Sequence, residues 1–210
     1  MLVLALDTAT TDLVAGIVDD GHVLAQSAVA TRAHNEMLVP EVNRLLVEAG
    51  KTYADLDAVV VGCGPGPFTG LRVGMATASA FGQALNIPVH GVCTHDAVGT
   101  QLEGSVLVVT DARRREVYWA RYENGRRVAG PDVCKPAELA TEPVDVLSVP
   151  GNLADQLQVD AGEVTYLPPT PEGLVAAADL NAEPAPLVPL YLRRPDAAEP
   201  KPTQVSPALR

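Results

Sequence analysis

The segment that most constrains the fold spans residues 62–74 and reads GCGPGPFTGLRVG. An apolar run at 58–61 enters it and a helical pattern leaves it. Glycine allows backbone angles that other residues resist, and proline fixes its own, so the glycines and prolines of 62–67 predict a loop of defined shape. We expect a strand, this loop and a helix whose N-cap is Thr69. Free N–H groups at a helix start can bind an anion, although the loop matches neither common phosphate-binding pattern.

Two halves of the chain repeat one pattern. An apolar strand ends at Asp7, and a hairpin turn begins 13 residues later at Asp20; a second strand ends at Asp111, 13 residues before the turn at Asn124. The Asp-Gly and Asn-Gly pairs are strong hairpin signals. The repeat predicts an internal duplication of strand, aspartate and hairpin with a boundary near residue 104. A coincidence between two β-meanders is the alternative.

The remaining pattern predicts an α/β protein whose second half is reduced. Its expected elements are helices at 35–49, 70–86, 94–103, 153–158 and 172–180 and strands at 87–92, 145–149 and 164–167. We divide the chain into an N-terminal lobe (1–104), a smaller C-terminal lobe (105–195) and a disordered tail (196–210) that is dense in proline and alanine.

Composition excludes several classes of protein. The formal net charge of −11 makes the isolated chain a poor ligand for RNA or DNA, because an acidic surface repels phosphates. The sequence contains no run of 18 or more apolar residues, so we expect no membrane span. The first residues predict a strand and not a signal peptide. Three widely spaced cysteines fit neither a disulfide framework nor a zinc site. We therefore expect a cytoplasmic protein that does not bind a membrane.

Four segments carry a resemblance to a known family. They are LALDTAT at 4–10, RAHNEMLVP at 32–40, GPGPFTGLRVG at 64–74 and PLYLRRP at 189–195. With the duplicated halves, they make the chain resemble the bacterial TsaB (YeaZ) family of tRNA threonylcarbamoyladenosine synthesis. The resemblance implies two ribonuclease-H-like lobes of the actin, Hsp70 and sugar-kinase (ASKHA) superfamily. Pro67 replaces the serine expected in the third segment.

The resemblance also implies a role without chemistry of its own. In that family the protein partners TsaD, which carries the metal and transfers the threonylcarbamoyl group to adenosine 37 of tRNA, and the ATPase TsaE joins the pair. It implies a homodimer when the chain is alone and only indirect contact with tRNA. We expect no cofactor on the chain alone, and ATP or ADP at the interface with TsaD remains open.

The residues agree that catalytic groups are missing. The four histidines (22, 34, 90 and 95) include no pair at i,i+4 spacing, so no helix face presents a metal-ligand pair. No glycine or lysine follows Asp7 where nucleotide-binding relatives use one. The alternative function is a free-standing nucleotide-dependent kinase or hydrolase of the same superfamily. Candidate anion or nucleotide contacts are Asp7, Thr8, Gly64, Gly66, Thr69 and Arg72.

Those candidates have structural alternatives. Asp7 can simply end its strand by accepting backbone N–H groups. Arg72 lies in the first turn of its helix, where the dipole disfavours a cation, so an internal salt bridge or a bound anion would offset that cost. The run Arg113–Arg115 is either a contact for an anionic partner or RNA, or a solvated turn.

The helix after the loop carries small residues at spacing four. This stripe either packs on the protein's own sheet or lets a partner helix approach closely. The family resemblance implies the second reading, with the 35–49 helix in the same interface. The predicted interface residues are Met37, Leu38, Glu41, Leu45, Gly70, Leu71, Gly74, Met75, Ala78, Phe81 and Gly82.

Overall fold

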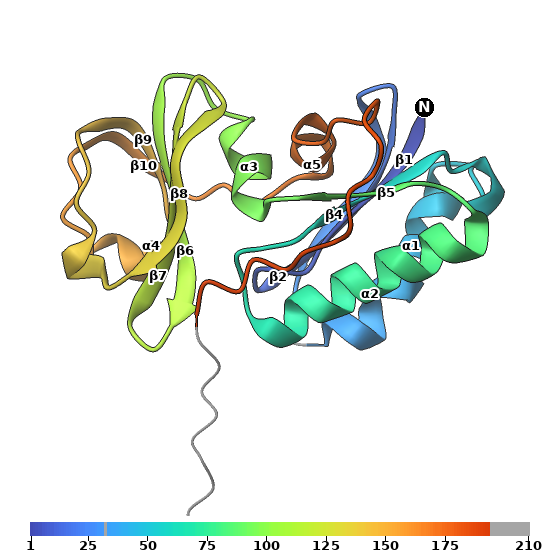
Figure 1. Ribbon diagram of the computed structural model, residues 1–210, viewed down its shortest axis with the longest axis horizontal. Helices are drawn as coiled ribbons and strands as arrows, with labels where there is room; N and C mark the ends of the chain where they lie inside the picture. Colours follow the sequence, from blue (N-terminus) through green and yellow to red (C-terminus); the bar gives the residue numbers. More distant parts are fainter. Residues whose placement is uncertain (32, 194–210) are drawn as a thin grey trace, which may run out of the picture.

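The computed structural model describes residues 1–31 and 33–193, in which two five-stranded sheets form two lobes side by side (Figure 1). The prediction for 196–210 lies outside the described residues. The first sheet has the order β3-β2-β1-β4-β5. Its strands are β1 (Leu2–Asp7), β2 (Asp12–Asp19), β3 (His22–Ala30), β4 (Ala58–Gly62) and β5 (Val89–Val92).

The second sheet repeats this topology strand for strand. Its order is β10-β9-β6-β7-β8. The strands are β6 (Ser105–Arg113), β7 (Glu116–Glu123), β8 (Arg126–Cys134), β9 (Val144–Ser148) and β10 (Ala161–Thr165). In each sheet three strands form an antiparallel meander and the next two pair in parallel. The predicted architecture is confirmed: the chain has two α/β lobes, each with the sheet topology of a ribonuclease-H-like fold.

Helices cover the two lobes unequally. Helices α1 (His34–Glu48) and α2 (Phe68–Leu85) lie on one face of the first sheet, while α3 (Thr94–Gly99) and α5 (Pro171–Ala176) lie between the sheets (Figure 1). The second lobe has only the one-turn α4 (Gly151–Ala154) between its parallel strands. Two 3-10 turns span Tyr53–Asp55 and Pro136–Glu138. Within the described ranges no helix is long and apolar enough to cross a membrane.

Strand β1 is buried on both of its faces. Leu4 and Leu6 join the core beneath α1 and α2, whereas Val3 and Ala5 join a second core with Leu174 of α5. Because successive side chains of a strand point to opposite faces, a strand covered on both sides reads as a continuous apolar run. This two-sided burial places Asp7, the last residue of β1, in the interior of the molecule.

The chain returns to the first lobe after completing the second sheet. Gly16 of β2 has room only for a hydrogen, because a Cβ there would lie 2.4 Å from Cγ of Pro171. Leu187 packs against the core beneath α1 and α2, and the N–H of Leu190 donates to the carbonyl of Cys63 at 2.8 Å. The predicted boundary at residue 104 thus falls between the sheets, while 171–190 contacts the first lobe. The division into folding units stays a prediction.

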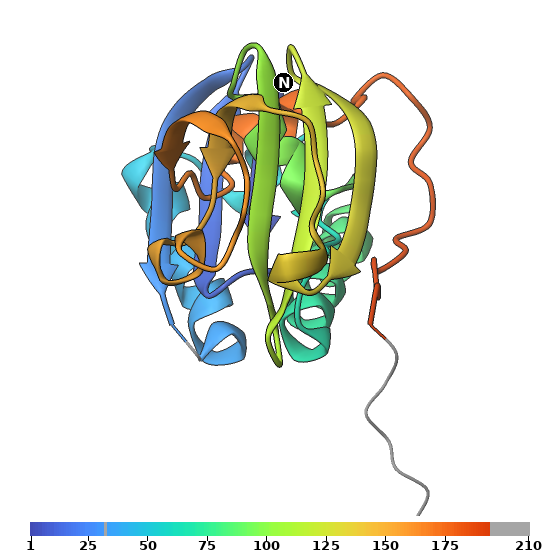
Figure 2. The same ribbon diagram turned by 90° about the vertical axis from the view of Figure 1, so that its left-hand side faces the viewer.

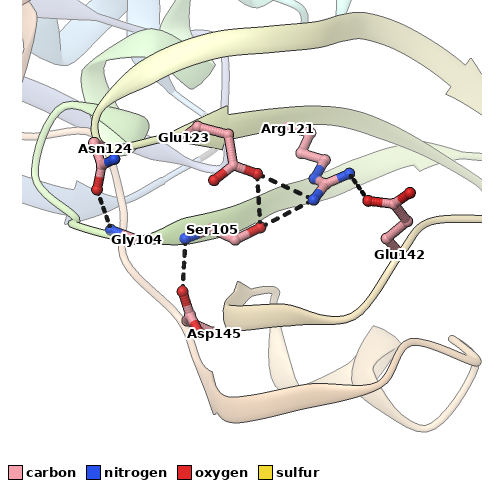
Figure 3. A network of polar contacts seen from close by, with 7 residues as sticks. All are labelled: Gly104, Ser105, Arg121, Glu123, Asn124, Glu142 and Asp145. Carbon is pink, nitrogen blue, oxygen red and sulfur yellow. Dashed lines mark hydrogen bonds and ion pairs between the residues drawn. The ribbon is translucent and has the colours of Figure 1, made fainter.

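A polar network secures the chain where it enters β6 (Figure 3). The carboxylate of Asp145 accepts the backbone N–H of Ser105 at 2.8 Å. The Ser105 hydroxyl donates to Glu123 at 3.0 Å, and Arg121 donates to the same carboxylate at 3.0 Å. These contacts join β6, β7 and β9 at the point where the two lobes are connected. The start of β6 is therefore fixed by side chains from both neighbouring strands.

The predicted N-cap of α2 is wrong. The N-cap of α2 is Pro67, so Thr69 lies inside the first turn of the helix and is exposed. The N-cap of α3 is Cys93, and Thr94 is the first residue of that helix. The side chains of Pro67 and Cys93 make no capping hydrogen bond to their helices. Threonine favours caps because its hydroxyl accepts a helical N–H, but Thr94 uses its hydroxyl for a more distant partner described below.

Three two-residue hairpins share one backbone geometry but differ in sequence. The central pairs Asp20-Gly21 (φ 47° and 82°), Asn124-Gly125 (50° and 75°) and Arg114-Arg115 (52° and 64°) all have positive φ. Asp-Gly and Asn-Gly are the pairs that this type I′ geometry favours. An arginine in the left-handed region costs roughly 1–2 kcal/mol because its Cβ crowds the backbone. The β6–β7 turn is therefore strained where the other two hairpins are not.

Replacing the strained pair should stabilise the chain. We expect Arg114→Asn combined with Arg115→Gly to raise the free energy of unfolding by about 1–2 kcal/mol, since it installs the preferred turn residues. Urea denaturation of both proteins at one pH measures the difference. The matched control is Gly21→Arg, which should destabilise through φ alone, because a Cβ on Gly21 would meet no described atom within 4 Å. Equal urea midpoints for wild type, the double variant and Gly21→Arg would contradict the prediction that the β6–β7 turn is strained.

Candidate functional site

The stripe of small residues on α2 faces the protein's own sheet. A Cβ on Gly70 would lie 2.3 Å from the carbonyl oxygen of Thr8, and one on Gly74 would lie 2.4 Å from the Thr8 hydroxyl. A Cβ on Gly82 would meet Val89 at 2.2 Å, and Ala78 is fully buried. These glycines let α2 lie close to β1 and β5. Of the two readings of the stripe, the structure shows packing on the protein's own sheet, so the interface with a partner helix that the family resemblance implied for these small residues is corrected.

The other predicted interface residues divide between core and surface. Leu38, Leu45 and Leu71 are fully or almost fully buried. Met37, Met75 and Phe81 are partly buried against the same core, and the Phe81 ring lies 5.3 Å from that of Tyr53. Glu41 is partly exposed and forms an ion pair with Arg44 at 2.7 Å. The predicted helices are thus correct, but most of the chosen side chains point inward.

The surface that α2 does present is aromatic and cationic. Phe68 is 52% exposed and its ring stacks on Tyr191 with centroids 5.1 Å apart. The guanidinium of Arg72 lies 4.0 Å from the Phe68 centroid, a cation–π geometry that offsets the unfavourable helix dipole. Among the described residues Arg72 has no ion pair, so the predicted salt bridge is replaced by ring contact.

A shallow groove follows this surface. It has a volume of about 470 Å³ and lies between α2 and the extended segment 187–191. We call it the α2 groove; it is lined by Arg72, Met75, Ala76, Ser79, Leu187, Pro189 and Tyr191. A second hollow of about 400 Å³ continues it along Phe68, Thr69 and Val73. Sequence reasoning missed Phe68, Ala76 and Tyr191; an aromatic residue at a helix start beside a proline loop is the signal that was available.

The predicted anion site is closed by the chain's own hydrogen bonds. The Thr94 hydroxyl donates to Oδ2 of Asp7 at 2.6 Å, and the N–H of Ala9 donates to Oδ1 at 2.7 Å, as the structural alternative for Asp7 predicts. The N–H of Gly64 donates to the Thr94 hydroxyl at 3.2 Å. The Thr8 hydroxyl donates to the carbonyl of Gly70 at 2.8 Å.

The glycines of the loop serve this closed arrangement. A Cβ on Gly62 would lie 1.7 Å from Oδ2 of Asp7, and one on Gly66 would lie 2.2 Å from the carbonyl oxygen of Ala9. The loop therefore packs tightly against the end of β1. Of the six predicted anion contacts, Asp7, Thr8, Gly64 and Gly66 lie together and are buried, whereas Thr69 and Arg72 are exposed.

The histidines do not assemble a metal site. The buried His95 lies at the lobe junction with Nε2 2.8 Å from the Thr110 hydroxyl, and burial lowers its pKa to about 3. Desolvation also lowers the pKa of His34. In residues 1–31 and 33–193 no group of three or more His, Cys, Asp or Glu side chains is placed to hold a metal ion.

Burial of Asp7 should give stability a measurable pH dependence. Desolvation raises its pKa from 3.8 to about 6, so the folded chain holds this proton more tightly than the unfolded chain. The contribution of Asp7 to stability is then largest below pH 4 and falls as pH rises from 4 to 6, by roughly 3 kcal/mol in total. We expect the difference in unfolding free energy between wild type and Asp7→Asn to fall by that amount, measured by urea denaturation from pH 4 to 7.

The matched control is Asp20→Asn. A hydrogen bond from the terminal amine lowers the pKa of the exposed Asp20, so its contribution is present above its unfolded pKa and is lost as pH falls. The two variants should therefore differ from wild type with opposite slopes. Parallel pH profiles for wild type and Asp7→Asn would show that Asp7 is not enclosed as described.

Comparisons with known proteins agree with this geometry. The family model for TsaD, tRNA N6-adenosine threonylcarbamoyltransferase, matches residues 23–181. A Mycobacterium bovis protein described as uncharacterized is 56% identical over 198 residues, covering 93% of each chain. A Mycobacterium leprae relative is 54% identical, but the match covers only 56% of that longer protein.

Named relatives give the same family. Escherichia coli TsaB, a tRNA threonylcarbamoyladenosine biosynthesis protein, is 36% identical over 136 residues, which cover 60% of this chain and 58% of that protein. The structure of YeaZ from Pseudomonas aeruginosa superposes with a TM-score of 0.73 at 27% identity, over 84% of this chain and 89% of that one. The repeated lobes, the closed loop and these matches establish that the chain belongs to the TsaB (YeaZ) family of tRNA threonylcarbamoyladenosine biosynthesis proteins.

Proposed function

We propose that the chain is a non-catalytic subunit that binds and activates its TsaD partner in the synthesis of N6-threonylcarbamoyladenosine at position 37 of tRNA. The observation that carries this proposal is the enclosure of Asp7. A carboxylate that already accepts hydrogen bonds from Thr94 and Ala9 has no exposed oxygen for a nucleotide-bound cation. The carboxylate oxygens that such chemistry would use at this position already accept hydrogen bonds from the protein itself.

The α2 groove supplies the docking face in this proposal. It combines an exposed aromatic pair, Phe68 and Tyr191, with the small side chain of Ala76. Aromatic and arginine side chains are enriched at the centre of protein interfaces. The same face would join two copies of the chain when TsaD is absent. TsaE would bind the assembled pair, and ATP or ADP would bind at the interface with TsaD.

The remaining parts of the proposal follow from charge and family. A chain of net charge −11 is expected to hold tRNA weakly by itself, so most of the tRNA contact would come from TsaD. The names of the relatives place them in tRNA modification, which supports a cytoplasmic location for this chain. The alternative, a free-standing nucleotide-dependent kinase or hydrolase, would need an accessible carboxylate at this position, whereas the Asp7 carboxylate is enclosed.

A bulky residue in the groove should block the partner without harming the fold. Ala76 is exposed on α2, so we expect Ala76→Trp to leave the unfolding midpoint unchanged and to weaken association with TsaD at least tenfold. Analytical size-exclusion and calorimetry with TsaD from the same genome measure this. The matched control is Val128→Trp on β8, which is 54% exposed in the second lobe. Unchanged TsaD affinity in Ala76→Trp would reject the docking face.

The absence of nucleotide chemistry has its own test. Titration of ATP with Mg²⁺ into the isolated chain should give no binding heat at micromolar concentration and no phosphate release. Asp7→Asn should behave in the same way, because the native carboxylate is enclosed. Micromolar affinity with turnover that is lost in Asp7→Asn would support the enzyme alternative and overturn the scaffold proposal.

A further inference from the structure

The two lobes are joined through the first turn of α3. The hydroxyl of Thr94, the first residue of this helix, donates to the carboxylate of Asp7 at the end of β1 at 2.6 Å. The next residue, His95, has Nε2 2.8 Å from the hydroxyl of Thr110 in β6. Both residues of α3 are buried. Successive residues of one helical turn are therefore bonded to different lobes.

Asp96 extends this junction across the second sheet. Its carboxylate accepts the hydroxyl of Tyr122 in β7 at 2.8 Å and forms an ion pair with Arg127 in β8 at 3.2 Å. Val98 joins the apolar core of the second sheet, and a Cβ on Gly99 would lie 2.4 Å from the ring of Tyr122. Because protein interiors are close-packed, a shift of α3 must also move the second sheet.

The same turn of α3 holds the loop that precedes α2. The N–H of Thr94 donates to the carbonyl of Gly64 at 2.7 Å, and the N–H of Gly64 donates back to the Thr94 hydroxyl at 3.2 Å. Soon after Gly64 the chain enters α2 at Phe68, which lines the second hollow. The position of the docking face on α2 is therefore tied to α3.

Two further contacts connect the lobes outside α3. The hydroxyl of Tyr166, which follows β10, donates to the carboxylate of Asp12 in β2 at 3.1 Å. Arg193 pairs with Glu116 of β7 at 2.9 Å, at the end of the segment 187–193 that contacts the first lobe. Figure 2, which faces the second lobe, shows this red segment running along one side of the molecule. All these contacts oppose a change in the angle between the lobes.

We propose that α3 couples the two lobes, so that the angle between them sets the position of the docking face and a partner bound at the α2 groove favours one angle. Hinge closure between lobes is a common transition in two-lobed proteins. Coupling of this kind is reciprocal, because an angle that weakens the partner's binding is also disfavoured by the bound partner. The identity of the partner as TsaD rests on the proposed function, whereas the coupling within the chain does not.

The variant Gly99→Ala tests the coupling, because its added methyl group must push α3 away from Tyr122. Gly99 lines neither hollow beside α2, so the docking surface keeps its own side chains. Residual dipolar couplings on the isolated chain should show a changed angle between the lobes, and the amide signals of Gly64 and Phe68 should shift. Calorimetry should show that association with TsaD weakens by about fivefold or more, as is typical of coupled sites.

The matched control is Gly151→Ala. A Cβ on Gly151 would meet no described atom within 4 Å, so the same chemical change is made without a wedge. This control should keep the lobe angle, the amide signals and the TsaD affinity of wild type.

A second variant decides the question if Gly99→Ala does not fold. Tyr122→Phe removes only the hydroxyl that donates to Asp96, and it should change the same three quantities in the same direction by a smaller amount. Its control is Tyr53→Phe, which loses a hydroxyl contact made within the first lobe and should leave the lobe angle unchanged.

The measurements separate the coupling from the proposed function. If the wild-type chain does not bind TsaD, the proposed function fails, and the lobe angle and amide signals of the isolated chain still decide the coupling. An unchanged lobe angle in both Gly99→Ala and Tyr122→Phe would overturn the inference. A changed angle with wild-type amide signals at Gly64 and Phe68, or with wild-type affinity for a TsaD that does bind, would overturn it as well.

Discussion

An enclosed carboxylate is the constraint on which the first lobe depends. Asp7 ends the buried strand β1, and its two oxygens receive the Thr94 hydroxyl from α3 and the N–H of Ala9. Gly62 must lack a side chain, because the carboxylate fills the space that a Cβ would need. One side chain thus fixes three backbone segments relative to one another. The Asp7 carboxylate therefore has a structural role in the first lobe.

The close approach of α2 to the sheet explains where the α2 groove lies. Gly70 and Gly74 bring the helix against Thr8, so its glycines face the sheet, and Leu71 and Ala78 are fully buried. Phe68 and Arg72 are then exposed and stack on one another, with Tyr191 completing the layer. Glycine inside a helix costs about 0.5–1 kcal/mol relative to alanine, and here the tight helix–sheet contact offsets that cost. The exposure of Phe68 and Arg72 on the outer face of α2 therefore follows from the packing of its glycines on the sheet.

The sequence predicts the fold better than it predicts the surface. Asp7, Asp20, Asp111 and Asn124 mark the duplicated hairpins, because turn chemistry is local and visible in neighbouring residues. The direction of the stripe on α2 is not local: periodicity finds the small face of a helix but does not say whether the sheet or a partner covers it. Tyr191 comes beside Phe68 only through the return of the chain over 123 residues, which no short pattern contains.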